Sequence, residues 1–354
     1  MKGTITYREA LRQSMHLALE ENPQAIIIGQ GVTDPTRIFG TTANLVETFG
    51  QNRVIDTAIA EEGITGIAIG AALNGLYPIQ THIRVDFMAL AMNQIINLAA
   101  KYKYMFGGSF KVPMLIRAVV GRSWGQGPQH SQSLQSLFSH IPGLTVIMPS
   151  TASQVLRSYR HALNNFQSPV ISIEHRLLYD MSFYEKTENQ SRDNAFSARI
   201  VQQGDGVTIV ATSYMVEEAQ KAAKWVKEQQ GIQVEIIDLH VVSHVDHNLI
   251  FESVSKTGRL IVADTSWLPY GVCAEVCRGI MGKNPGVLRQ PVTQIGMQHT
   301  PCPTSHVLED VFYPDIGTLI NAIYTQISGS KSHDMPLPSK EYIRDQYHIF
   351  KGPF

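Results

Sequence analysis

Short runs of aliphatic and β-branched residues alternate along the first half of the chain with segments in which apolar residues recur at helical spacing. Strands are expected at 25–28, 54–57, 77–83, 112–120, 144–148 and 170–174. Helices are expected between them, near 11–19, 62–73, 87–105 and 152–163. Strands that alternate with helices indicate right-handed crossovers and a parallel sheet covered on both faces. This pattern predicts an α/β domain.

A polar stretch interrupts the pattern between about residues 177 and 198 and marks a domain boundary. A second alternating block follows, with strands expected at 207–212, 234–239 and 259–263 and helices starting near Val216, His247 and Val272. From Gly329 on, the chain is polar but retains apolar residues such as Tyr342, so we expect an arm that packs on a neighbour. The predicted organisation is two α/β domains with parallel or mostly parallel sheets, at 1–176 and 199–328, a linker at 177–198 and an arm at 329–354.

Composition narrows the class of protein. The 354 residues fit two domains of roughly 150 residues each. Lys and Arg number 29 and Asp and Glu 30, and this near-neutral balance argues against nucleic-acid or anionic-membrane partners. Three cysteines are too few for a disulfide framework, the N-terminus lacks an apolar signal segment, and no apolar run is long enough to span a bilayer. We therefore expect a soluble, cytoplasmic protein.

Two neighbouring carboxylates, Glu61 and Glu62, stand where an expected strand passes into a helix. They could simply interact with the positive end of the helix macrodipole. Alternatively, one of them serves a ligand site, because such sites form at the carboxyl edge of a parallel sheet. Gly63, Gly66 and Gly70 follow at spacings of three and four residues, which favours a smooth helix ridge for close packing over a phosphate-binding loop.

A second cluster lies in the loop after the expected strand 112–120. This loop contains Gly121, Gly125 and Gly127 and then the segment Gln129–Gln132. Its histidine, His130, is a candidate for general acid–base work because imidazole titrates near neutral pH.

Several other motifs are not expected to form catalytic, nucleotide-binding or metal-binding sites. Gly204–Gly206 has the Gly-Asp-Gly form that opens a magnesium–diphosphate signature, but the helical segment 215–231 contains no asparagine to complete it. A plain turn is therefore expected there. No Walker motif, dinucleotide fingerprint or nucleophile elbow is present. The clustered histidines and cysteines of the second block also fit no zinc site: His240, His244, His247, Cys273 and Cys277.

The spaced motifs together resemble one family, the β subunits of thiamine-diphosphate-dependent 2-oxoacid dehydrogenases in the transketolase-like superfamily. The resemblance spans roughly residues 4–326, with the motifs in the family's order. Its first-half motifs are 53–64, 66–72, 94–97, 99–101, 129–132, 142–144, Glu174 and 178–179. Its second-half motifs are 271–272, 274–275, Pro301, Pro303 and 308–310.

The resemblance implies roles for five residues. Glu61 takes the place of the glutamate that hydrogen-bonds the aminopyrimidine ring of the cofactor, and Phe87 that of the aromatic residue that stacks on this ring. Ile59 and Ile83 would line the pyrimidine pocket. His130 matches the histidine that assists the substrate or the reductive acylation step.

The resemblance also implies partners and ions. In this family the diphosphate and Mg²⁺ are held mainly by an α subunit, so we expect an α2β2 heterotetramer with paired β chains, which passes an acyl group to the lipoyl domain of an acyltransferase. Some members hold a structural K⁺ through backbone carbonyls. The matching residues here are Met114, Ala162, Leu163, Asn165 and Gln167, with one additional residue before Pro169.

Two other functions are compatible with the same residues: half of a split transketolase-type carboligase, and a catalytically degenerate assembly subunit. The sequence also departs from the family's pattern near the expected cofactor site and interface. Arg84 and Asp86 replace mostly apolar or neutral residues, His240 stands where arginine is usual, and Thr265–Trp267 replaces a more acidic, glycine-rich stretch. The identity of the substrate is therefore open.

Overall fold

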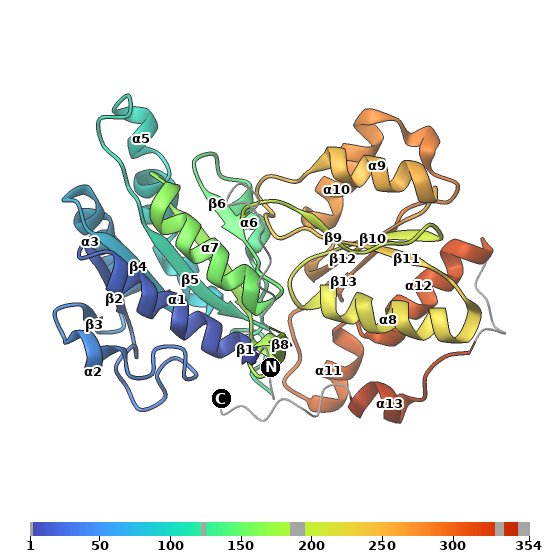
Figure 1. Ribbon diagram of the computed structural model, residues 1–354, viewed down its shortest axis with the longest axis horizontal. Helices are drawn as coiled ribbons and strands as arrows, with labels where there is room; N and C mark the ends of the chain where they lie inside the picture. Colours follow the sequence, from blue (N-terminus) through green and yellow to red (C-terminus); the bar gives the residue numbers. More distant parts are fainter. Residues whose placement is uncertain (1–2, 122–124, 185–194, 330–335, 346–354) are drawn as a thin grey trace. The chain divides into compact units, whose positions relative to one another are not determined.

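The computed structural model describes residues 3–121, 125–184, 195–329 and 336–345. These residues form two compact units. The first unit is drawn from residues 3–121 and 129–196, and the second from 125–128 and 197–345. Both units have α/β architecture, as the alternation of strands and helices predicts (Figure 1). Within the described parts of the chain, no helix is long and apolar enough to cross a lipid bilayer.

The first unit is built on a six-stranded sheet in the order β3-β2-β4-β5-β7-β6. All neighbouring strands are parallel. The strands are β2 (Ala25–Gly29), β3 (Val54–Asp56), β4 (Tyr77–His82), β5 (Leu115–Val120), β6 (Thr145–Ile147) and β7 (Val170–His175). Every residue of β2, β4, β5 and β7 is buried, which accounts for their nearly continuous apolar runs.

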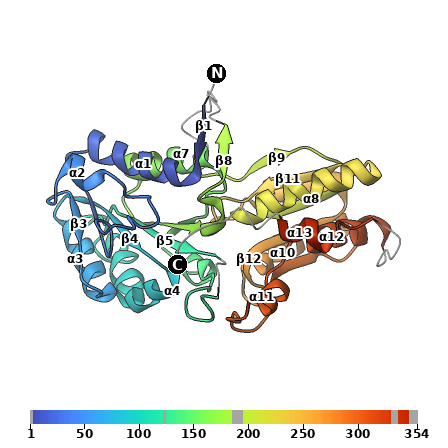
Figure 2. The ribbon, with the colours of Figure 1, turned by 90° about the horizontal axis from the view of Figure 1, so that it is seen from below.

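Helices cover both faces of this sheet. Figure 2 shows α1 (Tyr7–Glu21) and α7 (Ala152–Asn165) together over one face, and α3 (Glu61–Leu73) and α4 (Val85–Met88) on the other. The short helices α2 (Leu45–Phe49) and α6 (Gln135–Ser139) complete the unit. The N-terminus of α1 is capped by the Thr6 hydroxyl, which accepts the backbone N–H of Glu9 at 3.1 Å.

The expected helix over residues 87–105 is helical but not continuous. It divides into α4, a 3₁₀ turn at Ala89–Ala91, a π-helical segment at Gln94–Ala99 and α5 (Tyr102–Met105). In the π-helical segment the N–H of Ala100 donates to the carbonyl of Ile95, five residues back. Apolar spacing alone does not distinguish this wider winding from an α-helix.

The second unit holds a five-stranded sheet in the order β13-β12-β10-β11-β9. Its strands are β9 (Arg199–Gln202), β10 (Val207–Ala211), β11 (Val234–Asp238), β12 (Leu260–Trp267) and β13 (Thr293–Met297). All pairs are parallel except that of the edge strand β9 with β11. As expected, Gly204–Gly206 contains only the bend that leads into β10.

In this unit α8 (Tyr214–Gln230) and α12 (Ile316–Ser328) pack together on one face of the sheet. The helices α9 (His247–Thr257) and α10 (Val272–Lys283) lie on the other face (Figure 1). The remaining helices are α11 (His306–Phe312) and α13 (Lys340–Asp345). The sequence predicted α8, α9 and α10 but not α12 or the strands β9 and β13.

The described part of the C-terminal arm, residues 336–345, packs on its own unit. The Trp225 indole N–H of α8 donates to the carbonyl of Pro336 at 3.1 Å, and the Tyr324 hydroxyl of α12 donates to the same carbonyl at 3.2 Å. The Tyr342 ring lies 5.5 Å from that of Trp225. The apolar residues of this segment therefore cover α8 and α12. The rest of the expected arm, at 330–335 and 346–354, lies outside the described residues.

A fully buried ion pair crosses the sheet of the first unit. Arg117 on β5 donates to both carboxylate oxygens of Glu174 on β7, at 2.8 and 2.7 Å. The hydroxyls of Tyr159 and Tyr179 donate to the same carboxylate. A further guanidinium nitrogen of Arg117 donates to the Thr41 hydroxyl at 2.9 Å. The pair therefore connects two central strands, α7 and the loop after β2.

We expect Arg117→Met to lower the free energy of unfolding by about 3–5 kcal/mol, because it leaves the Glu174 carboxylate buried without its cation. Urea unfolding of the isolated chain measures this. The control is Arg160→Met, which breaks the exposed pair with Glu21 and should change stability by less than about 1 kcal/mol. Equal losses in the two variants would contradict the role assigned to the buried pair.

Candidate active site

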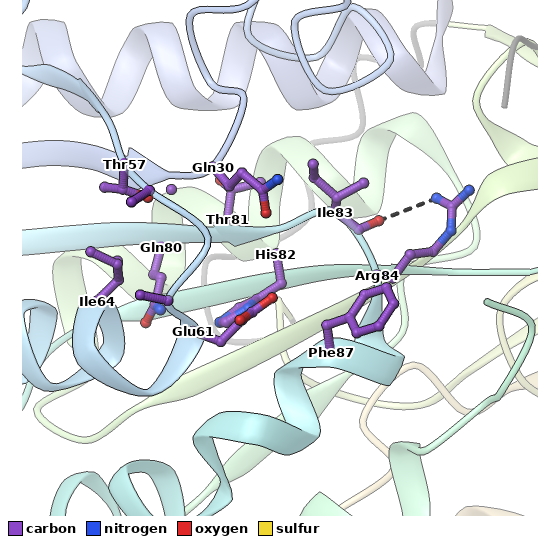
Figure 3. A pocket seen from close by; sticks show the side chains of 13 residues that line it. Gln30, Thr57, Glu61, Ile64, Gln80, Thr81, His82, Ile83, Arg84 and Phe87 are labelled. Carbon is purple, nitrogen blue, oxygen red and sulfur yellow. Dashed lines mark hydrogen bonds between the residues drawn. The ribbon is translucent and has the colours of Figure 1, made fainter. Parts of the chain in front are cut away.

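A pocket opens at the carboxyl edge of the sheet in the first unit, where β2 and β4 end and α3 begins (Figure 3). The backbones of β2 and β4 approach so closely here that a Cβ on Gly29 would lie 2.4 Å from the carbonyl oxygen of Thr81, so only glycine fits. The pocket is lined by Gly29, Gln30, Thr57, Ala58, Ala60, Glu61, Ile64, Gln80, Thr81, His82, Ile83, Arg84 and Phe87.

Glu61 lines this pocket as the first residue of α3. The Thr65 hydroxyl donates to the Glu61 carbonyl at 2.7 Å, and the Gln80 amide of β4 donates to that hydroxyl at 2.6 Å. This chain of hydrogen bonds fixes the first turn of α3 against the end of β4. The two interpretations of Glu61 are therefore compatible, because its charge stands both at a helix N-terminus and at the pocket.

Glu62, the second carboxylate at this junction, has a different contact. Its carboxylate accepts a hydrogen bond from the Gln94 amide of the π-helical segment at 2.9 Å, and it does not line the pocket. The structure thus separates two carboxylates that the sequence leaves equivalent. Of the two, only Glu61 is placed to contact a ligand in this pocket.

The structure brings His130 to the aromatic residue of the pocket. The rings of Phe87 and His130 meet edge to face, with centroids 5.2 Å apart at an interplanar angle of 77°. The Asp86 carboxylate accepts the backbone N–H of Gln132 at 3.1 Å and so ties the His130 loop to α4. Burial raises the pKa of Asp86, and the hydrogen bonds from Gln132 partly oppose this rise.

The two isoleucines assigned to the pocket differ in position. Ile83 lines the pocket beside Phe87, whereas Ile59 is 75 % exposed and is not a lining residue. The roles given to both residues remain predictions.

His82 and Gln80 are pocket residues that the sequence analysis did not single out. Both are buried, and among the described residues neither the His82 Nε2 atom nor the Gln80 Oε1 atom has a hydrogen-bond partner. Burial lowers the pKa of His82 to about 4, so its ring is neutral near pH 7. A signal was available, because a buried strand that ends in three consecutive polar residues, Gln80, Thr81 and His82, is unexpected.

The residues of this pocket fit an aminopyrimidine. Glu61 offers a carboxylate for a ring nitrogen, and Phe87 is 36 % exposed and offers a face for stacking. The Gln80 Oε1 atom has no hydrogen-bond partner among the described residues and can accept one from a ligand. In the described part of the chain, no group of three or more His, Cys, Asp or Glu side chains is arranged to hold a metal ion.

Three of the carbonyls proposed for K⁺ already accept backbone hydrogen bonds. The Met114 carbonyl accepts the N–H of Val170 at 3.0 Å, that of Ala162 accepts Phe166 at 3.3 Å, and that of Gln167 accepts Val112 at 3.2 Å. A carbonyl oxygen has two lone pairs, so it can accept one backbone N–H and still contact an ion. These hydrogen bonds therefore do not exclude the potassium site, which stays a prediction.

Comparison with known proteins assigns both units to one superfamily. The model of the transketolase pyrimidine-binding domain matches residues 3–181, and that of the transketolase C-terminal domain matches residues 197–318. A solved structure described as a split gene transketolase, inactive beta4 tetramer, has the same fold, with a TM-score of 0.72 at 22 % identity over 93 % of this chain and 100 % of that chain.

Relatives with higher sequence identity show which family within this superfamily the chain resembles. The mitochondrial pyruvate dehydrogenase E1 component subunit beta of Bos taurus is 35 % identical over 90 % of this chain and 89 % of the relative. The acetoin:2,6-dichlorophenolindophenol oxidoreductase subunit beta of Cupriavidus necator is 32 % identical over 94 % of this chain and 100 % of the relative. The chain belongs to the family of E1 β subunits of thiamine-diphosphate-dependent 2-oxoacid dehydrogenases.

We expect His82 to make the isolated chain less stable in mild acid. The unfolded state binds a proton at this ring below about pH 6.5, and the folded state only below about pH 4, so stability falls as the pH decreases through that window. Between pH 7 and pH 5 the loss is about 2 kcal/mol. Urea unfolding of wild type and His82→Phe at both pH values measures it, and identical pH dependence in the two proteins would contradict the burial effect.

Proposed function

We propose that this chain is the β component of a heteromeric enzyme that oxidatively decarboxylates a 2-oxoacid and transfers the acyl group to a lipoyl domain. The observation that carries this proposal is the single pocket that unites Glu61 and Phe87, with His130 against the Phe87 ring, in a chain of this family. Thiamine diphosphate supplies the thiazolium carbon at which the 2-oxoacid loses carbon dioxide.

In this proposal Glu61, Phe87 and His130 have different roles. Glu61 holds the pyrimidine ring through its ring nitrogen and controls the proton there, in a position fixed by Thr65 and Gln80. Phe87 presents its ring for stacking. His130 lies against the Phe87 ring, in a loop that the hydrogen bond between Asp86 and Gln132 connects to α4, and handles the substrate or the acyl acceptor.

The diphosphate and Mg²⁺ belong on the α partner in this proposal. The described residues offer a pyrimidine pocket without a cluster of metal-binding side chains. One hydrogen bond to Glu61 and one stacked ring contribute about 1–3 and 0.5–1.5 kcal/mol, too little for tight binding once ordering costs are met. The isolated chain should therefore bind the cofactor weakly.

The surface of α3 supports an α2β2 assembly in which two β chains pair. A Cβ on Gly66 or Gly70 would meet no other atom within 4 Å, so this chain's own packing does not require glycine at either position. Ile67, between them, is 59 % exposed. A smooth ridge beside an exposed apolar side chain suits the close approach of another subunit.

Glu61→Gln tests the assigned chemistry, because it keeps the shape of the side chain and removes the acid. In enzyme reconstituted with the α partner, we expect hydrogen exchange at the thiazolium carbon and acyl transfer from a 2-oxoacid to a lipoyl acceptor to slow by at least about 100-fold. The matched control is Glu62→Gln, which alters only the tie to Gln94 and should retain most activity.

Two outcomes would count against this assignment. Unchanged exchange in Glu61→Gln would remove Glu61 from the chemistry. Carbon–carbon ligation without any use of the lipoyl acceptor in the wild-type enzyme would favour the carboligase alternative.

Gly70→Leu tests the role of the helix ridge. Because the site is open and leucine favours helix, we expect the isolated chain to unfold at the same or a slightly higher urea concentration, by up to about 1 kcal/mol. Sedimentation of a mixture with the α partner should nevertheless show less of the α2β2 heterotetramer. The control is Gly282→Leu, another open helical glycine, which lies on α10 in the second unit. Full assembly of the Gly70→Leu chain would contradict the assigned interface.

A further inference from the structure

His82 ends β4 with a nitrogen atom that has no partner, in the same pocket as Glu61. The residue lines this pocket and is 5 % exposed. Its Nε2 atom is buried, and none of the described residues forms a hydrogen bond with it. Because an unpaired buried polar atom destabilises a fold, each one calls for a specific reason. A group that joins the pocket when the site is complete would provide that reason.

His82 lies on the face of β4 that α3 covers. Side chains alternate along a strand, and Figure 3 shows Gln80 and His82 on one side of β4 and Thr81 on the other. The Gln80 amide donates to the Thr65 hydroxyl of α3 at 2.6 Å. The face that carries Gln80 and His82 is therefore the one packed against α3.

The spacing along the two elements brings His82 level with Glu61. Because α3 connects the parallel strands β3 and β4, it runs antiparallel to β4. From Gln80 to His82 the strand advances by about 7 Å. From Thr65 back to Glu61 the helix covers about 6 Å in the same direction. Since Gln80 meets Thr65, His82 lies opposite Glu61, and both residues line the pocket.

Glu61 needs a second hydrogen-bond partner once a pyrimidine ring covers it. The ring nitrogen takes one carboxylate oxygen, and the ring excludes water from the other. An oxygen that is left without a donor there weakens the hold on the carboxylate. Burial lowers the pKa of His82 to about 4, so the ring is neutral near pH 7 and carries one N–H donor. The amide nitrogen of Gln80 is already bound to Thr65.

We propose that His82 is a positioning residue for Glu61. In the cofactor-loaded enzyme its Nε2–H donates to one oxygen of the Glu61 carboxylate and so orients the other oxygen toward the pyrimidine ring nitrogen. This inference rests on the proposed function and adds a residue that acts through Glu61. A neutral donor suits this role, because a cation at the same place would form an ion pair with Glu61 and compete with the ring nitrogen for the carboxylate.

His82→Phe tests the proposal, because it keeps a ring and removes both nitrogens. At pH 7 the isolated chain should unfold at the same or a higher urea concentration, since an unpaired buried nitrogen is lost. In enzyme reconstituted with the α partner, thiamine diphosphate and Mg²⁺, hydrogen exchange at the thiazolium carbon should nevertheless slow by about 10- to 100-fold, as for a lost hydrogen bond to a charged group. Calorimetric titration with thiamine diphosphate and Mg²⁺ measures Kd, which should change less than the exchange rate because Glu61 and Phe87 remain.

Two further variants separate positioning from a structural role. His82→Gln places an amide N–H near the position of Nε2 and should keep exchange within about threefold of wild type. In a Glu61→Gln background, His82→Phe should slow exchange by less than about a further threefold, because the carboxylate to be positioned is absent. The matched control is Tyr77→Phe. Tyr77 begins β4 and has a buried hydroxyl without a partner among the described residues, but it does not line the pocket, so exchange should be unchanged.

Several outcomes would overturn the inference and leave the proposed function intact. A lower urea midpoint for His82→Phe would make His82 a structural residue. Unchanged exchange in His82→Phe, equally slow exchange in His82→Gln, or the full loss repeated in the Glu61→Gln background would exclude the positioning role. The proposed function fails separately. A wild-type enzyme that exchanges the thiazolium proton but never acylates a lipoyl acceptor would overturn that function while the pairing of His82 with Glu61 stands.

Discussion

The buried pair of Arg117 and Glu174 is the constraint on which the site depends. Its charges are fully removed from water, so every donor and acceptor around it must be satisfied. Glu174 accepts four hydrogen bonds, two from Arg117 and two from tyrosine hydroxyls. Arg117 also reaches Thr41, whose hydroxyl fixes the carbonyl of Ile38. Through these hydrogen bonds the buried ion pair holds the loop that carries Phe39. The position of this loop at the edge of the sheet therefore depends on contacts inside the sheet.

The parts of the fold that depend on short stretches of sequence could be predicted. Buried runs with β-branched residues predicted the six parallel strands of the first unit, because such strands need apolar residues on both faces. The pairing of β1 (Thr4–Thr6) with β8 (Ser182–Tyr184) was missed, since it joins distant segments that are only three residues long. The resemblance to a family identified Glu61, Phe87 and His130 as site residues, and the structure brings them together.

Other parts of the site depend on tertiary contacts that no local pattern encodes. Glu61 and Glu62 are equivalent in sequence, and only the hydrogen bond from Gln94 to Glu62 separates them. Arg84 was visible as a departure from the family's pattern, but its neighbours Phe39 and Arg176 come from loops after two other strands. Ile59 illustrates the opposite case, because a residue that the family resemblance assigns to the pocket is 75 % exposed in this chain.

The polar residues that line the pocket differ in charge: one is an anion, one is a cation and one is neutral. Glu61 supplies a carboxylate at the N-terminus of α3, and Arg84 supplies a cation beside Phe87. Between these two on the chain, His82 is buried and, with a pKa of about 4, neutral near pH 7. A charged imidazole there would attract Glu61 and repel Arg84. Burying the histidine at the end of β4 keeps a hydrogen-bonding group in the pocket without adding a charge. With His82 neutral near pH 7, Glu61 and Arg84 are the charged side chains among the residues that line the pocket.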